Sequence, residues 1–92
     1  MQNFQNIDSL VAAGNLDEAV ERLTAMLGMA DVADADVIYF RRGKLYWRLG
    51  DRAAATSDYS KAVAINPSSP AAKALEQARD VADFFNPDLY NP

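Results

Sequence analysis

The sequence contains no cysteine and no histidine, and only four glycines and four prolines. Without cysteine the chain has neither a disulfide framework nor a thiolate metal site. Without histidine it lacks the commonest metal ligand and the usual general base at neutral pH. Most catalytic sites need one of these residues, so we expect a protein that is not an enzyme and that binds no metal or cofactor.

Carboxylates are the remaining candidates for chemistry, and none forms a convincing site. Pairs such as Asp17 with Glu21 stand at helical spacing on solvated faces, with no apolar pocket to raise a pKa. The cluster of Asp31, Asp34 and Asp36 lacks the glycine and the terminal glutamate of a calcium loop. Ordinary surface charge explains these residues better than catalysis does.

Long apolar runs are also missing. No stretch approaches the length of a membrane span, and the first six residues lack the basic and apolar regions of a secretory signal. The 92 residues, half of them hydrophobic, suffice for one small domain. We therefore expect a single cytoplasmic domain that does not contact a membrane.

The hydrophobic pattern predicts helices throughout. Apolar residues recur at helical spacing, and turn signals at Gly14, Gly50 and Asn66-Pro67 separate the segments. Ser69 is suited to cap the last helix. Residues 29–36 show little periodicity and stay undecided. The predicted helices cover residues 3–13, 17–28, 37–49, 52–65 and 70–85.

A helix–turn–helix unit recurs in the chain at an offset of 36 residues. The offset pairs residues of the same position in the two units: Gly14 with Gly50, Ala19 with Ala55, Leu23 with Tyr59, Met26 with Ala62, and Leu10 with Tyr46. Small residues let helix backbones approach, and aromatic residues fill the space between them.

Residues 36–69 resemble a full repeat of the tetratricopeptide family. The matching positions are the aromatic Tyr39, the small Gly43, the aromatic Tyr46, the turn at Gly50-Asp51, the second-helix residues Ala55, Tyr59 and Ala62, and the terminal Pro67. The first copy departs from the pattern at Asn3, Ile7 and Gly28. Arg42 replaces the common leucine, and we expect its stem to pack between helices and its head to reach water.

The resemblance implies an all-α fold, a right-handed superhelical stack of antiparallel helix hairpins with five helices. A degenerate repeat would cover residues 3–35, a full repeat residues 36–69, a capping helix residues 70–85 and an apolar tail residues 86–92. The first helix of each hairpin lines the concave groove in this family, and the groove holds segments of protein partners. Projected onto this chain, the groove-facing residues are Val37, Phe40, Arg41, Lys44, Trp47 and Arg48.

Charge is distributed unevenly around that groove. The chain carries a formal charge of −4, but residues 37–61 hold six basic and two acidic side chains, against one basic and seven acidic in residues 1–36. We predict a non-catalytic protein-interaction module that binds an extended or acidic peptide. Arg41 and Arg48 would act as fork donors, Lys44 as a point charge, and Phe40 and Trp47 as apolar walls.

Other interpretations stay open for these residues. The charges could be solvated or paired, and Trp47 could belong to the core. The basic central hairpin also allows a less favoured interpretation, binding of single-stranded nucleic acid, but the negative total charge argues against it. Some members of the family bind chaperone tails through a clamp of basic residues. Arg41 alone matches these positions, so we do not expect such a clamp here.

The last segment is too apolar to stay solvated. Phe84, Phe85, Leu89 and Tyr90 stand among its final nine residues. The favoured interpretation is a lid packed on the fifth helix. The alternative is a homodimer in which Leu89, Tyr90 and Pro92 enter the groove of another copy.

Overall fold

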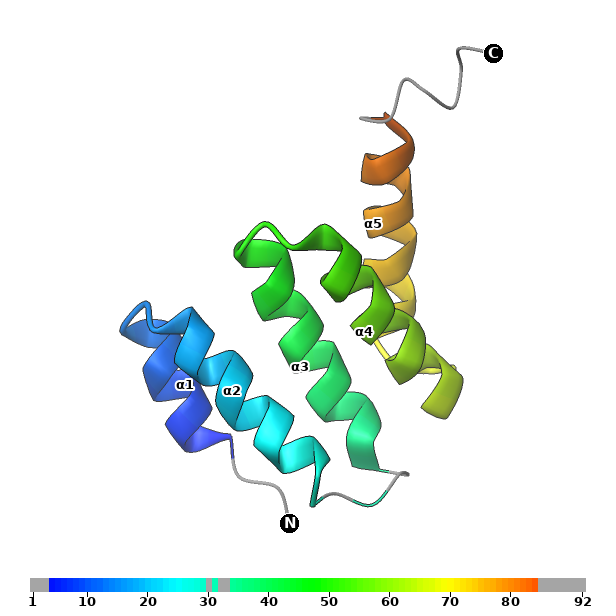
Figure 1. Cartoon of the computed structure of the whole chain (residues 1–92). Coiled ribbons are helices and arrows are strands. Elements are labelled where there is room, and N and C mark those ends of the chain that lie inside the picture. Colours follow the sequence, from blue (N-terminus) through cyan, green and yellow to red (C-terminus); the bar gives the residue numbers. More distant parts are fainter. Residues whose placement is uncertain (1–3, 30, 32–33, 85–92) are drawn as a thin grey trace.

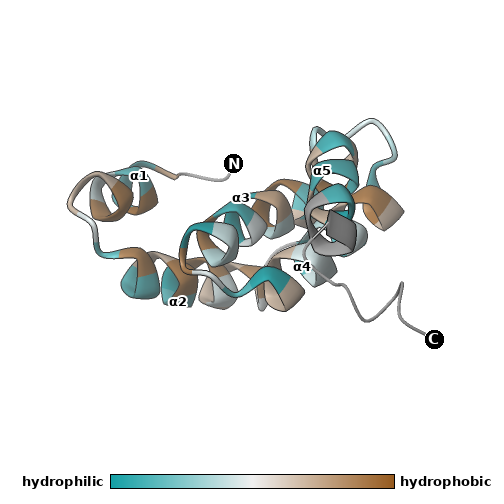
Figure 2. Cartoon of the chain, turned by 90° about the horizontal axis from the view of Figure 1, so that it is seen from above, coloured by the Kyte–Doolittle hydropathy of each residue, from teal (hydrophilic) through white to brown (hydrophobic). Residues whose placement is uncertain are grey.

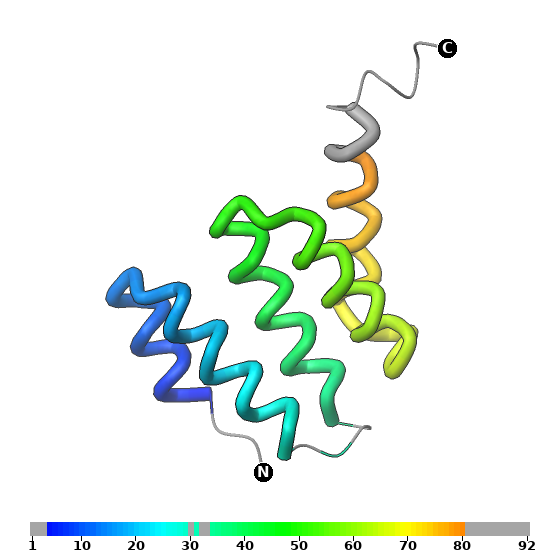
Figure 3. Tube along the Cα trace, viewed as in Figure 1, coloured from blue at the N-terminus to red at the C-terminus, as the bar shows by residue number. Residues whose placement is uncertain are grey.

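Five α-helices, stacked side by side, make up the described part of the chain (Figure 1). The computed structural model describes residues 4–29, 31 and 34–84. Each helix packs chiefly on the helix next to it in sequence, and successive helices run in opposite directions (Figure 3). The helices are α1 (Gln5–Ala12), α2 (Leu16–Leu27), α3 (Ala35–Arg48), α4 (Arg52–Ile65) and α5 (Ala71–Phe84). The predicted all-α stack of helix hairpins is confirmed.

The turns inside the two hairpins have the same geometry. Gly14 and Gly50 adopt φ angles of 84° and 87°, in the left-handed region that side chains with a Cβ rarely occupy. The Asn15 N–H donates to the Leu10 carbonyl at 2.8 Å, and the equivalent bond from Asp51 is 2.9 Å. This pattern is a Schellman motif, which satisfies the last carbonyls of α1 and α3. The 36-residue repeat seen in the sequence is therefore a repeat of backbone conformation.

The predicted helix bounds are close to the observed ones, with one informative difference. α3 begins at Ala35, two residues before the predicted Val37. It therefore includes the last two residues of segment 29–36, which the sequence left undecided. Asp36 is buried in this first turn and accepts a hydrogen bond from Asn66 Nδ2 at 3.1 Å. Ser69 caps α5 as expected, because its Oγ accepts the Ala71 N–H at 3.1 Å.

The core has two parts that meet at α3. One part fills the space among α1, α2 and α3, with Ile7, Ala19, Leu23, Ile38 and Leu45 buried. The other lies between α4 and α5 and is covered by the aromatic residues of α3, with Ala55, Tyr59, Ala62, Ala71, Leu75 and Ala78 buried. Seen from above, α3 lies between the two outer pairs of helices (Figure 2). α3 therefore contributes side chains to both parts of the core.

Some sequence predictions fall on residues that the structure does not describe. The tail of residues 86–92, with Leu89, Tyr90 and Pro92, lies outside the described residues, as do Asn3 and Phe85.

Gly43 lies at a close contact between α3 and α4. A Cβ built on Gly43 would lie 2.7 Å from Cε1 of Tyr59 and 3.3 Å from the Ala55 carbonyl oxygen. Tyr59 is buried, with 4% of its surface exposed, so its ring has little room to move. The small residue is thus required at this position because an aromatic ring occupies the space beside it.

We expect Gly43→Ala to lower the free energy of unfolding by about 1–3 kcal/mol, since overpacking forces a rigid neighbour to shift. Gly28→Ala is the matched control, because Gly28 has a φ of −68° and a Cβ there meets only the Ala25 carbonyl at 3.4 Å. Urea unfolding followed by circular dichroism measures both. Equal stability of the two variants would show that the α3–α4 contact is looser than described.

Candidate functional site

The concave side of α3 is hollowed on both flanks. Toward α1 lies a depression of about 160 Å³, and toward α5 lie depressions of about 490, 370 and 300 Å³. Phe40 and Lys44 of α3 line more than one of them, so the hollows adjoin along this helix. We call this surface the α3 groove. Its lining includes all six groove-facing residues predicted from the sequence, Val37, Phe40, Arg41, Lys44, Trp47 and Arg48.

Arg41 is already engaged within the groove. Its Nη1 lies 3.0 Å from Oδ1 of Asp8 on α1, and its guanidinium carbon lies 3.9 Å from the centre of the Phe4 ring. Both charged side chains are well exposed, at 37% and 66%. An exposed pair of this kind contributes about 0.2–1 kcal/mol. A carboxylate arriving from a partner could therefore displace Asp8 at small cost.

Lys44 and Arg48 form fewer polar contacts within the protein than Arg41 does. Both are exposed, and within the described part of the chain neither forms an ion pair. Lys44 Nζ lies 5.4 Å from the centre of the Phe40 ring, a cation–π contact that holds the ammonium group over the groove. Arg48 lines the depression toward α1. These two charges face outward and can meet an acidic group.

Phe40 and Trp47 form apolar parts of the groove toward α5. The Phe40 ring centre lies 6.1 Å from that of Tyr59, at an angle of 43°. Trp47 is half-buried against the α4–α5 core and lines the largest of these depressions, while the Arg52 guanidinium lies 4.9 Å from its ring centre. Trp47 therefore belongs both to the core and to the groove wall.

Tyr59 contributes an uncharged side chain to this part of the groove, and Asp80 also lines the depression. Burial raises the pKa of Tyr59 above its ordinary value of 10.0, and the negative charge of Asp58 raises the pKa further. The phenol thus stays protonated at neutral pH. The α5 side of the groove offers an apolar floor with charges at its edge.

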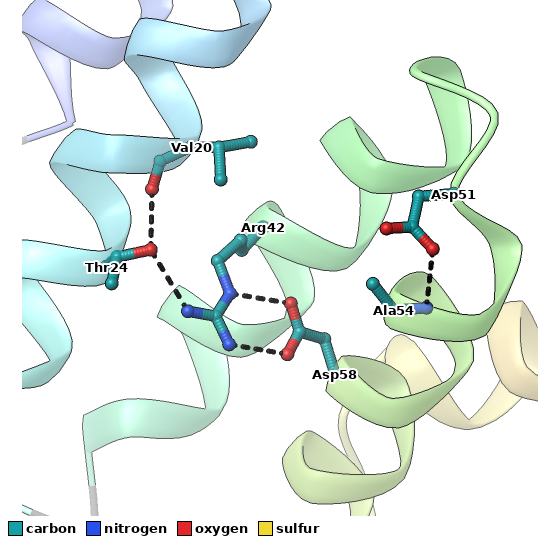
Figure 4. Close-up of polar contacts among 6 residues, drawn as sticks. All are labelled: Val20, Thr24, Arg42, Asp51, Ala54 and Asp58. Carbon is teal, nitrogen blue, oxygen red and sulfur yellow. Dashed lines mark hydrogen bonds and ion pairs between the residues drawn. The ribbon is translucent and has the colours of Figure 1, made fainter.

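Arg42 corrects a prediction, because its head is mostly withdrawn from water and only 13% of its side chain is exposed. The guanidinium forms a bidentate ion pair with Asp58 of α4, with Nε–Oδ2 and Nη2–Oδ1 distances of 2.7 and 2.8 Å (Figure 4). Its Nη1 donates to Thr24 Oγ1 of α2 at 3.1 Å. The hydrogen bond to Asp58 raises the pKa of Arg42 despite its partial burial. One side chain therefore links α2, α3 and α4.

The comparisons with known proteins agree with this architecture. Residues 37–69 match the tetratricopeptide repeat. The fold is similar to the solution NMR structure of protein BF1650 of Bacteroides fragilis, with a TM-score of 0.84 and 33% sequence identity. That likeness covers 99% of this chain and 91% of the other. The chain belongs to the tetratricopeptide repeat family. A comparison with curated proteins gave no match.

Tetratricopeptide repeats generally mediate protein–protein interactions, and the family is typically non-catalytic. Among residues 4–29, 31 and 34–84, no group of histidine, cysteine, aspartate or glutamate side chains could hold a metal ion. No described helix is both long and apolar enough to cross a membrane.

The repeat also explains the polar face of α5. Thirty-four residues after Tyr39, Arg42, Gly43 and Tyr46, the positions that pack inside a hairpin, α5 carries Lys73, Glu76, Gln77 and Asp80. All four side chains are exposed. This face of α5 is suited to water, as the predicted capping role requires.

Sequence reasoning missed Asp58 and Thr24 as partners of Arg42. Asp58 has only 1% of its surface exposed, although aspartate is almost never buried unless it is paired. A signal was present, since a charged residue stands at the usual leucine position of one helix and an opposite charge beside Tyr59 of the next. Recognising it requires knowing that these two positions face each other.

We expect Arg42→Met and Asp58→Leu each to lower the free energy of unfolding by about 3–5 kcal/mol, because each leaves a buried charge unpaired. The double variant should recover most of this loss. Arg22→Met, at an exposed position of α2, is the control and should change stability by no more than about 0.5 kcal/mol. Urea unfolding checks all four. Additive losses in the double variant would mean that the two charges act independently.

Proposed function

We propose that this protein is a non-catalytic interaction module that binds an extended, acidic and partly apolar segment of a partner protein in the α3 groove. The observation that carries the proposal is the position of Lys44 and Arg48. Both charges stand exposed on α3: Lys44 Nζ lies 5.4 Å from the centre of the Phe40 ring, and Arg48 lines the depression toward α1. The resemblance to the family implies that partners bind along this helix.

The apolar side of the groove suits large side chains of a partner. Trp47 and Tyr59 line the depression of about 490 Å³ together with the small residues Ala74 and Ala78. Buried aromatic residues at the centre of a contact usually supply most of its binding energy. In an extended segment alternate side chains point the same way, so every second residue could enter this floor.

The charged side of the groove favours acidic residues over basic ones. Lys44, Arg48 and Lys73 stand at its edge, and Arg41 is held by Asp8 at 3.0 Å. A partner carboxylate can replace that of Asp8 without leaving Arg41 unpaired. Complementary charge speeds association and excludes partners of the wrong sign.

Binding of single-stranded nucleic acid is less well supported. Of the aromatic residues available for stacking, Tyr39 and Tyr46 lie against the Arg42 guanidinium, at 5.7 and 5.5 Å from its carbon to the ring centres. Arg42 itself is paired with Asp58. The basic hairpin thus uses its central cation and two of its rings internally.

Selection from a random peptide library on the immobilised protein tests the proposal. We expect enrichment of peptides in which Asp or Glu alternates with Leu, Phe or Tyr. Lys44→Glu/Arg48→Glu should weaken the selected peptides at least about tenfold, since each reversed charge replaces attraction by repulsion. The matched control, Arg22→Glu/Arg79→Glu, makes the same change of net charge on exposed positions outside the groove.

Asp8→Asn should change the affinity for the peptide in the opposite direction. Removing the internal competitor for Arg41 should tighten binding by up to about fivefold, the equivalent of an exposed ion pair. Enrichment of basic peptides, or equal losses in the groove variant and its control, would refute the proposal. If the protein binds single-stranded nucleic acid and selects no peptide, nucleic-acid binding is favoured as the function.

A further inference from the structure

The depression between α3 and α5 is hollow because α5 contributes small residues to it. Ala74 and Ala78 face Trp47 of α3 and Tyr59 of α4 across about 490 Å³. Larger side chains on α5 would fill this space. The hollow therefore leaves one edge of the aromatic pair Trp47 and Tyr59 uncovered, and an apolar segment could cover this edge.

The chain carries a segment of matching chemistry immediately after α5. Residues 84–92 contain four large apolar side chains, those of Phe84, Phe85, Leu89 and Tyr90, one acidic residue and no basic residue. Such a segment is poorly suited to water. The groove supplies complementary charge, since Lys44 and Lys73 line the adjoining depression of about 300 Å³.

The segment also begins within reach of the hollow. Asp80 lines the depression, and α5 continues only to Phe84, about 6 Å farther along the helix axis. Asn86-Pro87 is a turn signal. If the chain reverses there, the three residues from Asp88 to Tyr90 span about 10 Å in extended form, enough to return to the level of Asp80.

We propose that residues 86–92 fold back along α5 of the same chain and that Leu89 and Tyr90 occupy the hollow beside Trp47. The inference rests on the proposed function, because it places the segment where a partner peptide would bind. A tether this short gives an effective concentration in the millimolar range, which favours the chain's own groove over that of a second copy. The segment would then compete with partners for the groove.

Trp47 reports on this contact directly, because it is the only tryptophan in the chain. The full chain is compared with a chain that ends at Phe85, by emission wavelength and by acrylamide quenching. We expect the truncated chain to emit at longer wavelength and to be quenched more strongly. A synthetic peptide of residues 86–92, added to the truncated chain, should reverse both changes.

Point variants give a second test that leaves the length of the chain unchanged. Leu89→Asp/Tyr90→Asp should reproduce the effect of truncation, whereas the control Asn91→Asp should not, although it adds charge to the same segment. If truncation lowers the helical content, its effect on quenching could come from unfolding, and the point variants then decide whether the segment covers Trp47. Identical quenching in the full, truncated and doubly substituted chains would overturn the proposal.

Measurements at several protein concentrations distinguish docking within one chain from docking on a second copy. Emission that is independent of protein concentration, with a monomeric mass by light scattering, supports the contact within one chain. A dimeric mass that truncation abolishes would overturn it in favour of a homodimer in which Leu89, Tyr90 and Pro92 enter the other groove.

The two proposals fail in different ways. If Trp47 quenching rises on truncation but neither chain selects acidic peptides, the proposed function fails and the internal contact stands. If the full and truncated chains bind a selected peptide equally tightly and quenching is unchanged, the internal contact alone fails.

Discussion

The ion pair between Arg42 and Asp58 joins α3 to α4 and restricts the rotation of α3 about its own axis. Its two charges are placed between helices, where neither can be left unpaired without a large loss of stability. Residues Phe40 and Lys44 are four apart and share a helix face, while Arg42 lies midway between them in sequence and points to the other side. With the guanidinium held between α2 and α4, Phe40 and Lys44 accordingly lie on the groove side of α3.

This arrangement changes the meaning of the charge pattern. The basic central hairpin contains cations of different kinds: Arg42 is structural, Arg41 is paired with Asp8 at the surface, and Lys44 and Arg48 are exposed. In the proposed function, Lys44 and Arg48 contribute to recognition, together with Arg41 after exchange of its partner. On this proposal, a small number of side chains on α3 determine which partners bind, while buried positions such as Ile38, Gly43 and Leu45 serve packing.

The sequence predicted the features that depend on local pattern. Gly14 and Gly50 marked both turns, and Ser69 marked the start of α5. The small and aromatic residues of the repeat, Gly43 and Tyr59 among them, indicated close packing of the helices. It did not predict contacts between charged residues that are far apart along the chain. The pairs of Arg42 with Asp58 and of Arg41 with Asp8 join different helices, and helical periodicity contains no information on which polar residues meet.

The central claim is that partners bind along α3 and α5 on the concave side of the stack. Amide and indole chemical-shift mapping by NMR, during titration with a library-selected acidic peptide, tests it most directly. The account predicts shifts at Phe40, Lys44, the Trp47 indole and the α5 residues from Lys73 to Ala78, with Arg22 of α2 and Lys61 of α4 unaffected. Shifts centred on α2 and α4, with the Trp47 indole unchanged, would contradict it.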